Sequence, residues 1–374
     1  MRLINYYIKK KFNPVPIKTN NKLNLLKHVK LRKNLIQNHL KIPLNLLKNK
    51  DILEFGPNRG ENSFIYALNK ANLFFVEPVP YSAKQLKAKY KHYNLNKFVK
   101  KIDNKSLEKF NTKQKFDLVI AEGFLNTLDE RDQYLTKILK FVKDSGLVIL
   151  NYDDYFGSLI ELIKSAILKK YCIKKKIRLD SEASLKISKQ LYYQDFRKLK
   201  NTRPFKAYWL DQLSCEFVED VWKFEKLLDL AYRKNFYFYS SSPMWSVSEN
   251  KIWYKNINLK SKNNSNKKIF NEWKKNLAYF VTGNEKIKFP GNQKIIFQEF
   301  DFLIKQIINF LKNKKNTFKK LKNKKSLFFN EINSILSFLN DKSKNLNYKK
   351  LKTFRSYTGT NLHYLCLKKN EKNF

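Results

Sequence analysis

An apolar run that ends in a glycine turn is the feature that most constrains this chain. Residues 51–55 read Asp-Ile-Leu-Glu-Phe, Gly56 follows, and a helical pattern begins at Gly60. A second apolar run, Leu-Phe-Phe-Val at 73–76, is closed by Glu77. Unbroken apolar runs of this length are typical of strands buried on both faces, and glycine allows the positive φ of a tight turn. The segment therefore predicts a strand, a glycine turn, a helix and a second strand.

The same alternation continues as far as residue 151. Strand-like runs lie at 51–55, 72–77, 97–102, 116–121 and 146–151. Helix-like segments separate them, at 60–70, 81–92, 104–110 and 130–142. The apolar residues of the last segment recur at the spacing of a helix that lies on a sheet: Leu135, Ile138, Leu139 and Val142. The predicted fold class is α/β, with a doubly wound, mostly parallel sheet.

After Asn151 the rhythm changes. Residues 155–170 and 211–234 have helical patterns, whereas residues 171–200 are basic and irregular. Two further strand candidates, at 235–240 and 251–255, are separated by turn-forming residues and indicate an antiparallel hairpin. We therefore expect seven strands in the sheet, the last two forming a late antiparallel pair.

Three regions follow along the chain. We expect an N-terminal helical segment over 1–50 and a Rossmann-like domain over 51–258, with a helical insertion at about 155–234. A polar linker at 259–268 opens a basic, α-helical C-terminal appendage over 259–374. Two apolar stripes in the appendage must be buried on each other, on the rest of the chain or across a dimer. They consist of Ile296, Phe300, Leu303, Ile304, Ile307 and Leu311, and of Ile332, Ile335, Leu336 and Leu339.

The net charge of +45 is a weak argument for a nucleic-acid partner. Of the 77 basic residues only nine are Arg, whereas dedicated nucleic-acid readers favour the bidentate fork of Arg. A Lys- and Asn-rich composition with little Gly is what an AT-rich genome encodes whatever the function. We therefore regard compositional drift as the favoured explanation, and a nucleic-acid partner as an alternative.

Metal, disulfide and membrane signals are missing from the sequence. The three Cys, at 172, 215 and 366, are far apart, and the four His do not cluster. No apolar run approaches the ~20 residues needed to cross a bilayer, and the N-terminus does not resemble a signal peptide. These patterns predict a cytoplasmic protein without a metal site or a transmembrane segment.

The order of strand, glycine turn, helix, strand and acid is typical of a sheet that binds an adenine nucleoside. The backbone approaches the ligand at the turn, and the acid, here Glu77, accepts hydrogen bonds from ribose hydroxyls. A carboxylate at this position also argues against a ligand with a 2′-phosphate. A nicotinamide-linked Rossmann enzyme and a plain strand-to-helix turn remain as alternatives.

The same residues resemble motif I of the class I S-adenosylmethionine-dependent methyltransferases. Asn58 stands where that family has its middle glycine, and Asn is the non-glycine residue that best tolerates positive φ. The resemblance implies that the glycines flank the methionine portion of S-adenosylmethionine, that Glu77 holds the ribose and that Asp103 faces the adenine. It also implies a pocket wall at Glu122, in a segment that resembles motif IV. The implied cofactor residues are Glu54, Gly56, Asn58, Gly60, Glu77, Asp103 and Glu122.

Candidate catalytic residues follow from the geometry of methyl transfer, which is an in-line displacement at a sulfonium. A hydroxyl acceptor benefits from a nearby base, whereas an amine has less need of one. The acceptor is expected above the carboxyl ends of the fourth and fifth strands. Candidates for the base are Asp153, Asp154 and Glu122. Asn126 and Tyr152 are expected at the same opening of the active site, at the ends of these strands. An exposed acidic strand end is the alternative, and the spacing matches a divalent-cation site poorly.

A second resemblance covers residues 50–255 and concerns a bacterial subgroup often associated with surface-polysaccharide or secondary-metabolite genes. It rests on 202–213 and 237–243. It implies an acceptor side lined by Arg203, Tyr208, Trp209 and Asp211, where aromatic rings stack on a sugar or planar substrate. Packing of Tyr208 and Trp209 against the sheet is the alternative.

Three functions are therefore open at this stage. The first is methyl transfer to oxygen or nitrogen of a small molecule or glycan precursor. The second is an RNA or protein methyltransferase that uses the basic tail to bind its acceptor. The third is an inactive methyltransferase fold that serves as a binding or assembly subunit. His28 and His39 precede the first strand and either overhang the cofactor cleft or pack as ordinary histidines.

Overall fold

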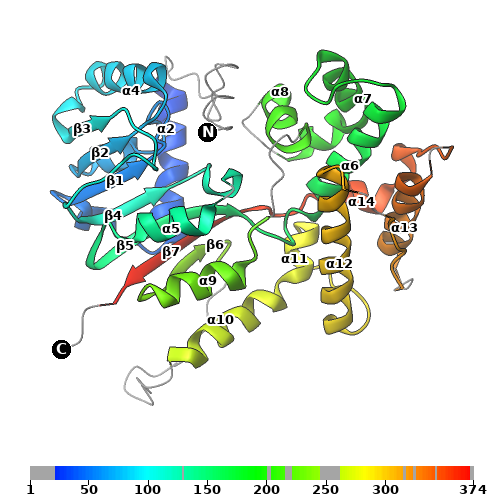
Figure 1. The fold of residues 1–374 in the computed structure, drawn as a ribbon. Coiled ribbons are helices and arrows are strands. Elements are labelled where there is room, and N and C mark those ends of the chain that lie inside the picture. Colours follow the sequence, from blue (N-terminus) through cyan, green and yellow to red (C-terminus); the bar gives the residue numbers. More distant parts are fainter. Residues whose placement is uncertain are drawn as a thin grey trace. The chain divides into compact units, whose positions relative to one another are not determined.

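The computed structural model describes residues 22–128, 130–199, 204–214, 221–244, 262–314, 317–322, 326–341 and 343–370. The chain divides into two compact units (Figure 1). The first comprises Met1–Tyr152, Trp222–Trp273 and His363–Phe374. The second comprises Asp153–Val221 and Lys274–Leu362.

The described strands form a sheet in the order β3-β2-β1-β4-β5-β7-β6 (Figure 1). Their bounds are β1 Asp51–Phe55, β2 Asn72–Val76, β3 Val99–Asp103, β4 Phe116–Ala121, β5 Val142–Asp153, β6 Phe236–Ser242 and β7 Leu362–Lys369. Neighbouring strands from β3 to β5 are parallel, and β6 and β7 are antiparallel. The predicted fold class, a mostly parallel seven-stranded sheet with a late antiparallel pair, is confirmed.

The helices of the first unit lie between these strands and before them. They are α2 Lys22–Lys33, η1 Asn34–His39, η2 Leu44–Leu47, α3 Phe64–Leu68, α4 Pro80–His92, η3 Asn96–Phe98, η4 Leu125–Thr127, α5 Arg131–Leu139, α9 Phe224–Arg233 and most of α10 Lys262–Lys275. Of the segment predicted to be helical over 1–50, the described part contains α2, η1 and η2. The helix predicted over 60–70 is shorter, because a turn occupies the residues before Phe64.

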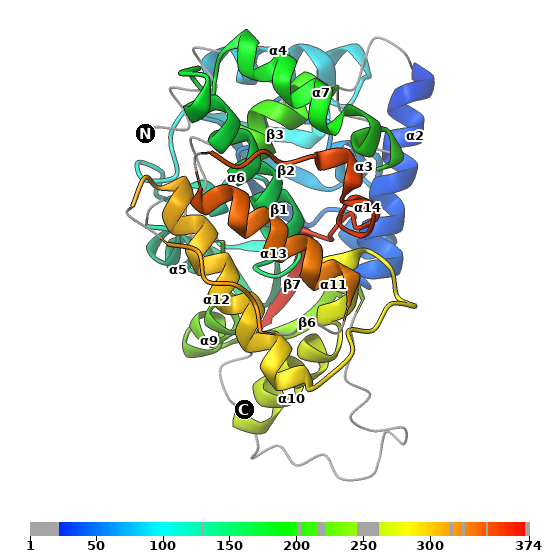
Figure 2. The same ribbon diagram turned by 90° about the vertical axis from the view of Figure 1, so that its right-hand side faces the viewer.

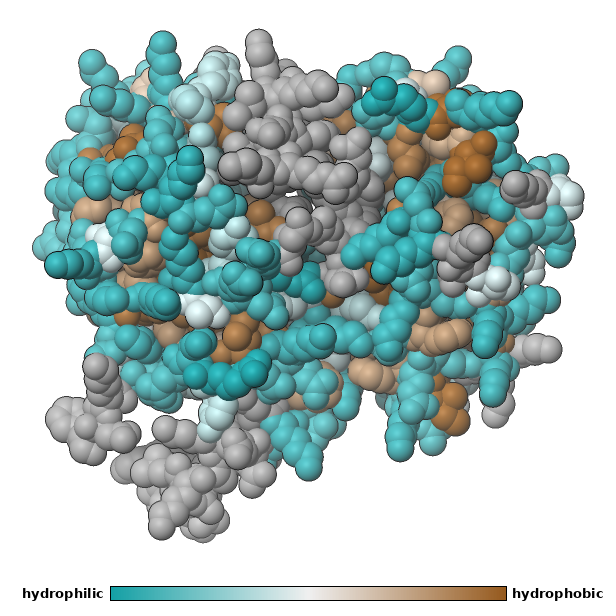
Figure 3. All heavy atoms as spheres, viewed as in Figure 1, coloured by the Kyte–Doolittle hydropathy of each residue, from teal (hydrophilic) through white to brown (hydrophobic). Residues whose placement is uncertain are grey.

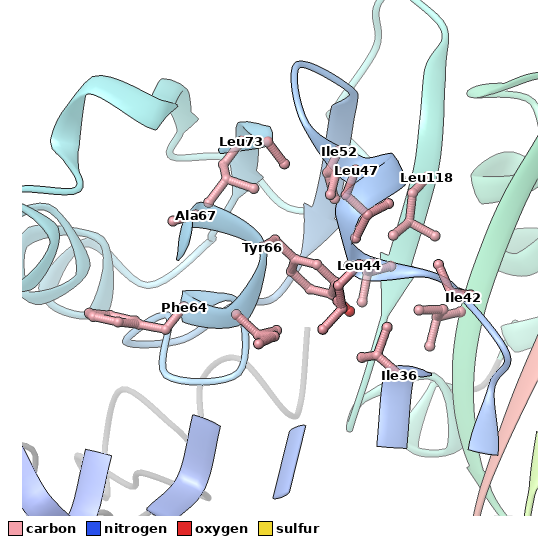
Figure 4. Packing of buried hydrophobic residues seen from close by; sticks show 14 of the residues in the cluster. Ile36, Ile42, Leu44, Leu47, Ile52, Phe64, Tyr66, Ala67, Leu73 and Leu118 are labelled. Atoms are coloured by element: carbon pink, nitrogen blue, oxygen red, sulfur yellow. The ribbon is translucent and has the colours of Figure 1, made fainter. Parts of the chain in front are cut away.

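Alternate residues of the strands build two separate cores. Ile52 and Leu118 point to the face that is covered by α2, η1, η2, α3 and α4, where the ring of Tyr66 lies among Leu44 and Leu47 (Figure 4). On the other face Phe55 packs edge-to-face on Phe110, with ring centroids 5.5 Å apart. Burial on both faces is the reason why these strands read as unbroken apolar runs.

The strand that pairs with β6 differs from the one that the sequence predicts. β6 pairs with β7, which comes from the end of the chain, and the predicted partner at 251–255 lies outside the described residues. Leu365, Cys366 and Leu367 of β7 are fully buried. The C-terminal region is therefore helical for most of its length, but its last described element is a strand of the sheet. A short strand that follows a long helical region has no strand pattern beside it to reveal its partner.

Three local predictions were wrong. Residues 104–110 form a turn rather than a helix, because the segment is too short to nucleate one and is anchored by buried Leu107 and Phe110. The irregular stretch at 171–200 contains α7, Glu182–Lys198, whose buried positions include polar residues that hide the helical period. The predicted linker at 259–268 contains the start of α10 at Lys262, because the apolar residues of that helix begin only at Ile269.

The second unit is helical. Its elements are α6 Leu159–Lys174, α7 Glu182–Lys198, α8 Phe205–Tyr208, η5 Trp209–Leu213, α11 Leu277–Thr282, α12 Gln293–Leu311, α13 Leu327–Asn340, η6 Tyr348–Lys350 and α14 Lys352–Ser356. The two predicted apolar stripes lie on α12 and α13 and are mostly buried. The rings of Phe300 on α12 and Phe329 on α13 stack with centroids 5.6 Å apart, and both helices contact α6 (Figure 2).

Lysines of α6 bind the carboxyl ends of α12 and α13. The Lys169 ammonium donates to the carbonyl oxygens of Phe310 and Leu311 at 3.0 and 2.7 Å. Lys170 donates to the carbonyl oxygen of Leu339 at 2.7 Å. Both lysine side chains are buried, and each satisfies carbonyls that the helix leaves unpaired at its end. These contacts explain how a very basic sequence buries part of its charge.

The surface of the described residues is mostly hydrophilic in the view of Figure 3, with small and separate hydrophobic patches. None of the helices among the described residues combines the length and the hydropathy that a bilayer crossing requires.

Candidate cofactor site

The loop after β1 has the backbone conformation that only glycine adopts freely. Gly56 has φ +65°, and its N–H donates to the carbonyl oxygen of Val76 at 2.9 Å. Gly60 has φ +76°, and a Cβ there would lie 2.8 Å from the ring of Tyr90. Both positions therefore favour glycine through positive φ, and at Gly60 the contact with the Tyr90 ring disfavours a side chain as well. The loop follows the carboxyl end of β1, where open α/β sheets bind ligands.

Asn58, at the position of the motif's middle glycine, has a backbone conformation that is usual for glycine. It has φ +53°, in the left-handed region that Asn tolerates. Its backbone N–H donates to one carboxylate oxygen of Glu77 at 2.8 Å, and the N–H of Val79 donates to the other at 2.9 Å. The Glu77 carboxylate thus faces the glycine loop. Burial raises the pKa of Glu77 to about 7.

Glu54 is tied to the loop rather than exposed on its own strand. Its carboxylate accepts a hydrogen bond from the Ser63 hydroxyl, and its side chain is almost completely buried. Burial, together with the nearby negative charge of Glu122, raises the pKa of Glu54 to about 8. At neutral pH this carboxyl is therefore largely protonated and contributes little charge to the site.

Glu122 follows β4 directly, and both of its oxygens have partners. Arg32 of α2 donates one N–H to each oxygen, at 2.7 and 3.0 Å, and the two side chains are almost completely buried. The side-chain amide of Asn62 donates to the same carboxylate at 3.1 Å. A carboxylate held in this way is a poor candidate for a general base, because a proton on it would break the ion pair.

Arg32 and Asn62 are site residues that the sequence reasoning missed. One signal was available for Arg32, since it is one of nine Arg in the chain and lies in a Lys-rich helix. Arg provides a bidentate fork that Lys lacks. Asn62 had no comparable signal, because its neighbours in the loop already explained the turn.

The two histidines before β1 have structural partners. His28 lies 3.0 Å from the Asn62 side-chain oxygen, and burial together with the positive charge of Arg32 lowers the pKa of His28 to about 4. His28 is therefore neutral at physiological pH. His39 lies 3.0 Å from the hydroxyl of Ser242 in β6.

Asp103 ends β3 beside Glu77. Its carbonyl oxygen accepts from the backbone N–H of Glu77 at 3.0 Å, and Lys101 lies 3.1 Å from its carboxylate. Asn104, the next residue, donates to the carbonyl oxygen of Glu77 at 2.7 Å. Because no helix follows Asp103, its carboxylate does not serve as a helix cap.

The residues expected at the mouth of the site are differently placed. Tyr152 is fully buried, with its ring 6.3 Å from that of Phe224 in a stacked arrangement, and this burial argues against contact with an acceptor. Asp153 is half-buried at the end of β5. Asp154, in the second unit, is fully buried and accepts from the backbone N–H groups of Phe156 and Gly157 at 3.0 and 2.8 Å. Its carboxylate therefore shapes the turn before α6.

The expected acceptor residues are only partly described. Arg203 lies outside the described residues. Trp209 is 2% exposed, and Tyr208 is also buried and donates its hydroxyl to Glu161. Gln212 donates to Asp211 at 3.3 Å. These aromatic rings are packed in the interior of the second unit.

Unpaired polar atoms at the carboxyl edge of the sheet fit a polar ligand. The side-chain oxygens of Asn58 and Asn126 and the Nε of Arg32 are buried and have no hydrogen-bond partner. Buried polar groups are normally paired, and unpaired ones often mark a ligand or water site. Each Glu77 oxygen also retains a lone pair for a hydroxyl donor. These residues fit an adenosyl ligand with a charged amino-acid end. No trio of His, Cys, Asp or Glu in the described part of the chain forms a metal site.

The family comparison matches the part of the chain that contains this site. Residues 27–188 match a family model described as a methyltransferase domain. No curated protein matches the sequence. The family match and the strand order together show a class I methyltransferase fold, as the sequence resemblance predicts.

Solved structures resemble the chain only distantly. PKMT2 from Rickettsia typhi, in complex with AdoHcy, is 11% identical with a TM-score of 0.43, over 90% of this chain and 54% of that chain. The CcbJ methyltransferase from Streptomyces caelestis is 18% identical with a TM-score of 0.28, over 30% of this chain and 47% of that chain. The matches thus span about half the length of these proteins. Similarity at this level carries no information on the acceptor.

Proposed function

We propose, on the premise that residues 27–188 form a class I S-adenosylmethionine-dependent methyltransferase domain, that this chain transfers a methyl group to oxygen or nitrogen of a small molecule or glycan precursor. The cofactor of this class supplies an electrophilic methyl group on a sulfonium. The observation that carries the proposal is the hydrogen bond from the Asn58 N–H to Glu77, which brings the glycine loop and the acid together.

Different residues of the chain are proposed to bind different parts of the cofactor. Gly56 and Gly60 let the backbone approach the ligand, and the buried Glu77 carboxylate accepts from ribose hydroxyls. Asp103 lies at the next strand end and is proposed to face the adenine. Glu54 stabilises the loop through Ser63, and Glu122 forms a wall of the pocket that is fixed by Arg32.

Among the candidate catalytic carboxylates we favour Asp153 as the proton acceptor. Glu122 is bound by Arg32, and Asp154 is occupied by two backbone N–H groups. A proton acceptor contributes about 10²–10⁴-fold to a reaction of this kind, and less when the acceptor is an amine. Asp153→Asn should therefore slow transfer to a hydroxyl by that factor without weakening cofactor binding. Tyr152, Arg203 and Trp209 remain proposed acceptor residues, although the burial of Tyr152 and Trp209 favours a supporting role.

Calorimetry with S-adenosylmethionine tests the proposal. Glu77→Ala should weaken binding about 10²–10⁴-fold, because two hydrogen bonds to a charged acceptor are lost. Glu225→Ala is the matched control, since Glu225 is exposed on α9. If the wild-type chain does not bind the cofactor, the enzyme assignment fails and an assembly role is favoured.

The RNA or protein methyltransferase remains the second candidate because the C-terminal region is basic. Residues 259–374 contain 27 basic and 7 acidic residues. Binding of a polyanionic acceptor should weaken steeply with salt, because displaced counterions drive the association. Salt-independent acceptor binding would exclude an RNA acceptor.

A further inference from the structure

Helix α2 is attached to the first unit by few apolar contacts. Of residues 23–33 only Leu25 and Arg32 are buried. Leu23, Leu26 and Leu31 are all more than half exposed. An amphipathic helix of this length normally buries a stripe of three or four apolar residues for every two turns. The apolar contribution to the docking of α2 is therefore small.

Besides Leu25 and Val29, which pack against the apolar core, polar contacts attach α2 to the candidate site. Arg32 donates one hydrogen bond to each oxygen of the Glu122 carboxylate. His28, one turn earlier in α2, contacts the side-chain oxygen of Asn62 at 3.0 Å. Asn62 itself donates to Glu122 at 3.1 Å, so that the contacts form one connected network. Both partners of α2 belong to the candidate site, because Asn62 lies in the loop after β1 and Glu122 follows β4.

The Arg32–Glu122 pair is buried and is complete only when α2 is docked, whereas the contacts that Asn62 makes with Glu122 and with His28 are partly buried. Without Arg32, Glu122 would be a buried carboxylate next to Glu54, with the Asn62 amide as its remaining partner. Without Glu122, the guanidinium would be left with neutral partners, the Tyr364 hydroxyl at 3.5 Å and the nearby Tyr66 hydroxyl. An unpaired buried charge is strongly unfavourable. Arrangements in which α2 is partly docked and one of the two charges is buried without its partner are therefore disfavoured.

We propose that Arg32 is a positioning residue that couples the docking of α2 to the occupancy of the cofactor site. The inference rests on the proposed function. The cofactor's amino-acid end carries a carboxylate, and Arg32 brings a cation with an unpaired, buried Nε to this edge of the sheet only when α2 is docked. A ligand that interacts better with the docked state stabilises it, and by linkage the docked helix raises the affinity for the ligand.

Hydrogen exchange provides the test, with two ligands that share the adenosyl part. S-adenosylhomocysteine carries the amino-acid end, whereas adenosine lacks it. We expect S-adenosylhomocysteine to slow amide exchange in residues 22–33 by at least about tenfold, and adenosine to leave that exchange unchanged. Calorimetry on the same samples shows whether each ligand is bound.

Arg32 variants separate positioning from general stability. Arg32→Met should weaken binding of S-adenosylhomocysteine by roughly 5–150-fold, the usual range of coupling between sites, and should change adenosine binding much less. Arg32→Lys keeps the charge but not the fork, and its effect should be intermediate. Lys30→Met is the matched control, because Lys30 is exposed on the same helix.

The outcomes are distinguishable from those of the proposed function. If the wild-type chain binds S-adenosylhomocysteine but exchange in α2 does not change, the coupling is overturned and the cofactor assignment stands. An equal loss of both ligands in Arg32→Lys, the milder variant, would show a merely structural role and would also overturn it. If neither ligand binds the wild-type chain, the proposed function itself has failed.

Discussion

The backbone N–H of Asn58 lies 2.8 Å from a carboxylate oxygen of Glu77, so that the loop after β1 and the end of β2 are joined directly. Asn58 makes this bond with a left-handed backbone, since its φ is +53°. A departure from the usual glycine is thereby compatible with the same loop. The relationship leads to predictions that depend on backbone conformation and on buried charge.

Substitutions at Asn58 should rank by their tolerance of positive φ. Asn58→Gly should leave stability nearly unchanged, whereas Asn58→Val should destabilise the chain by about 1–2 kcal/mol, because a β-branched residue is strained in this region. Urea unfolding of the two variants measures the difference. Equal stability of the Gly and Val variants would contradict the strained loop.

Alanine substitutions at Gly60 and Gly123 distinguish the cost of backbone strain from the cost of overpacking. Both have positive φ, but a Cβ at Gly60 would meet the Tyr90 ring at 2.8 Å, whereas a Cβ at Gly123 would meet nothing within 4 Å. Gly123→Ala should therefore cost about 1 kcal/mol, and Gly60→Ala about 2–4 kcal/mol, because overpacking adds to the strain. Thermal unfolding of the pair provides the comparison, and a larger loss at Gly123 would be inconsistent with the packing at Gly60.

The stability of the ligand-free chain should fall as the pH rises from about 6.5 to about 8. Glu54 and Glu77 have folded-state pKa values of about 8 and about 7, above their ordinary value. Their contribution is therefore fully present below the unfolded pKa and is lost as the pH rises through the folded pKa. His28, with a pKa of about 4, acts in the opposite direction but only at lower pH.

Glu54→Gln tests this pH dependence. The substitution removes the titrating group, so the loss of about 1–2 kcal/mol that Glu54 contributes over this window should disappear. Urea unfolding midpoints at several pH values measure the slope, with Glu225→Gln as an exposed control. An unchanged slope in Glu54→Gln would assign the pH dependence to other groups.

Lys169 should contribute more to stability than an exposed lysine of the same unit. Its ammonium satisfies two carbonyl oxygens at the end of α12, whereas Lys305, within α12, forms an i,i+4 pair with Asp301 and is largely exposed. Lys169→Met should cost about 1–3 kcal/mol and Lys305→Met less than about 0.5 kcal/mol. Denaturant unfolding of the two variants measures these losses of stability. Equal losses in the two variants would contradict the expectation.

The local sequence pattern was sufficient to predict the strands from β1 to β5 and the position of the loop after β1. The strands from β1 to β5 were readable because burial on both faces makes each an unbroken apolar run. Gly56, Asn58 and Glu77 could be placed because a strand-to-helix turn and a strand end are local features. Where polar residues occupy buried helical positions, as in α7, the same reasoning failed.

Contacts between distant segments were decided by the tertiary structure alone. The pairing of β6 with β7 joins residues more than a hundred positions apart, and the Arg32–Glu122 pair joins α2 to the end of β4. The sequence of this protein determined the strands from β1 to β5, the glycine turn and the carboxylates at the strand ends, since these depend on neighbours along the chain. Only the folded chain determined which charges meet, because a buried ion pair depends on the positions of two side chains that no local pattern relates.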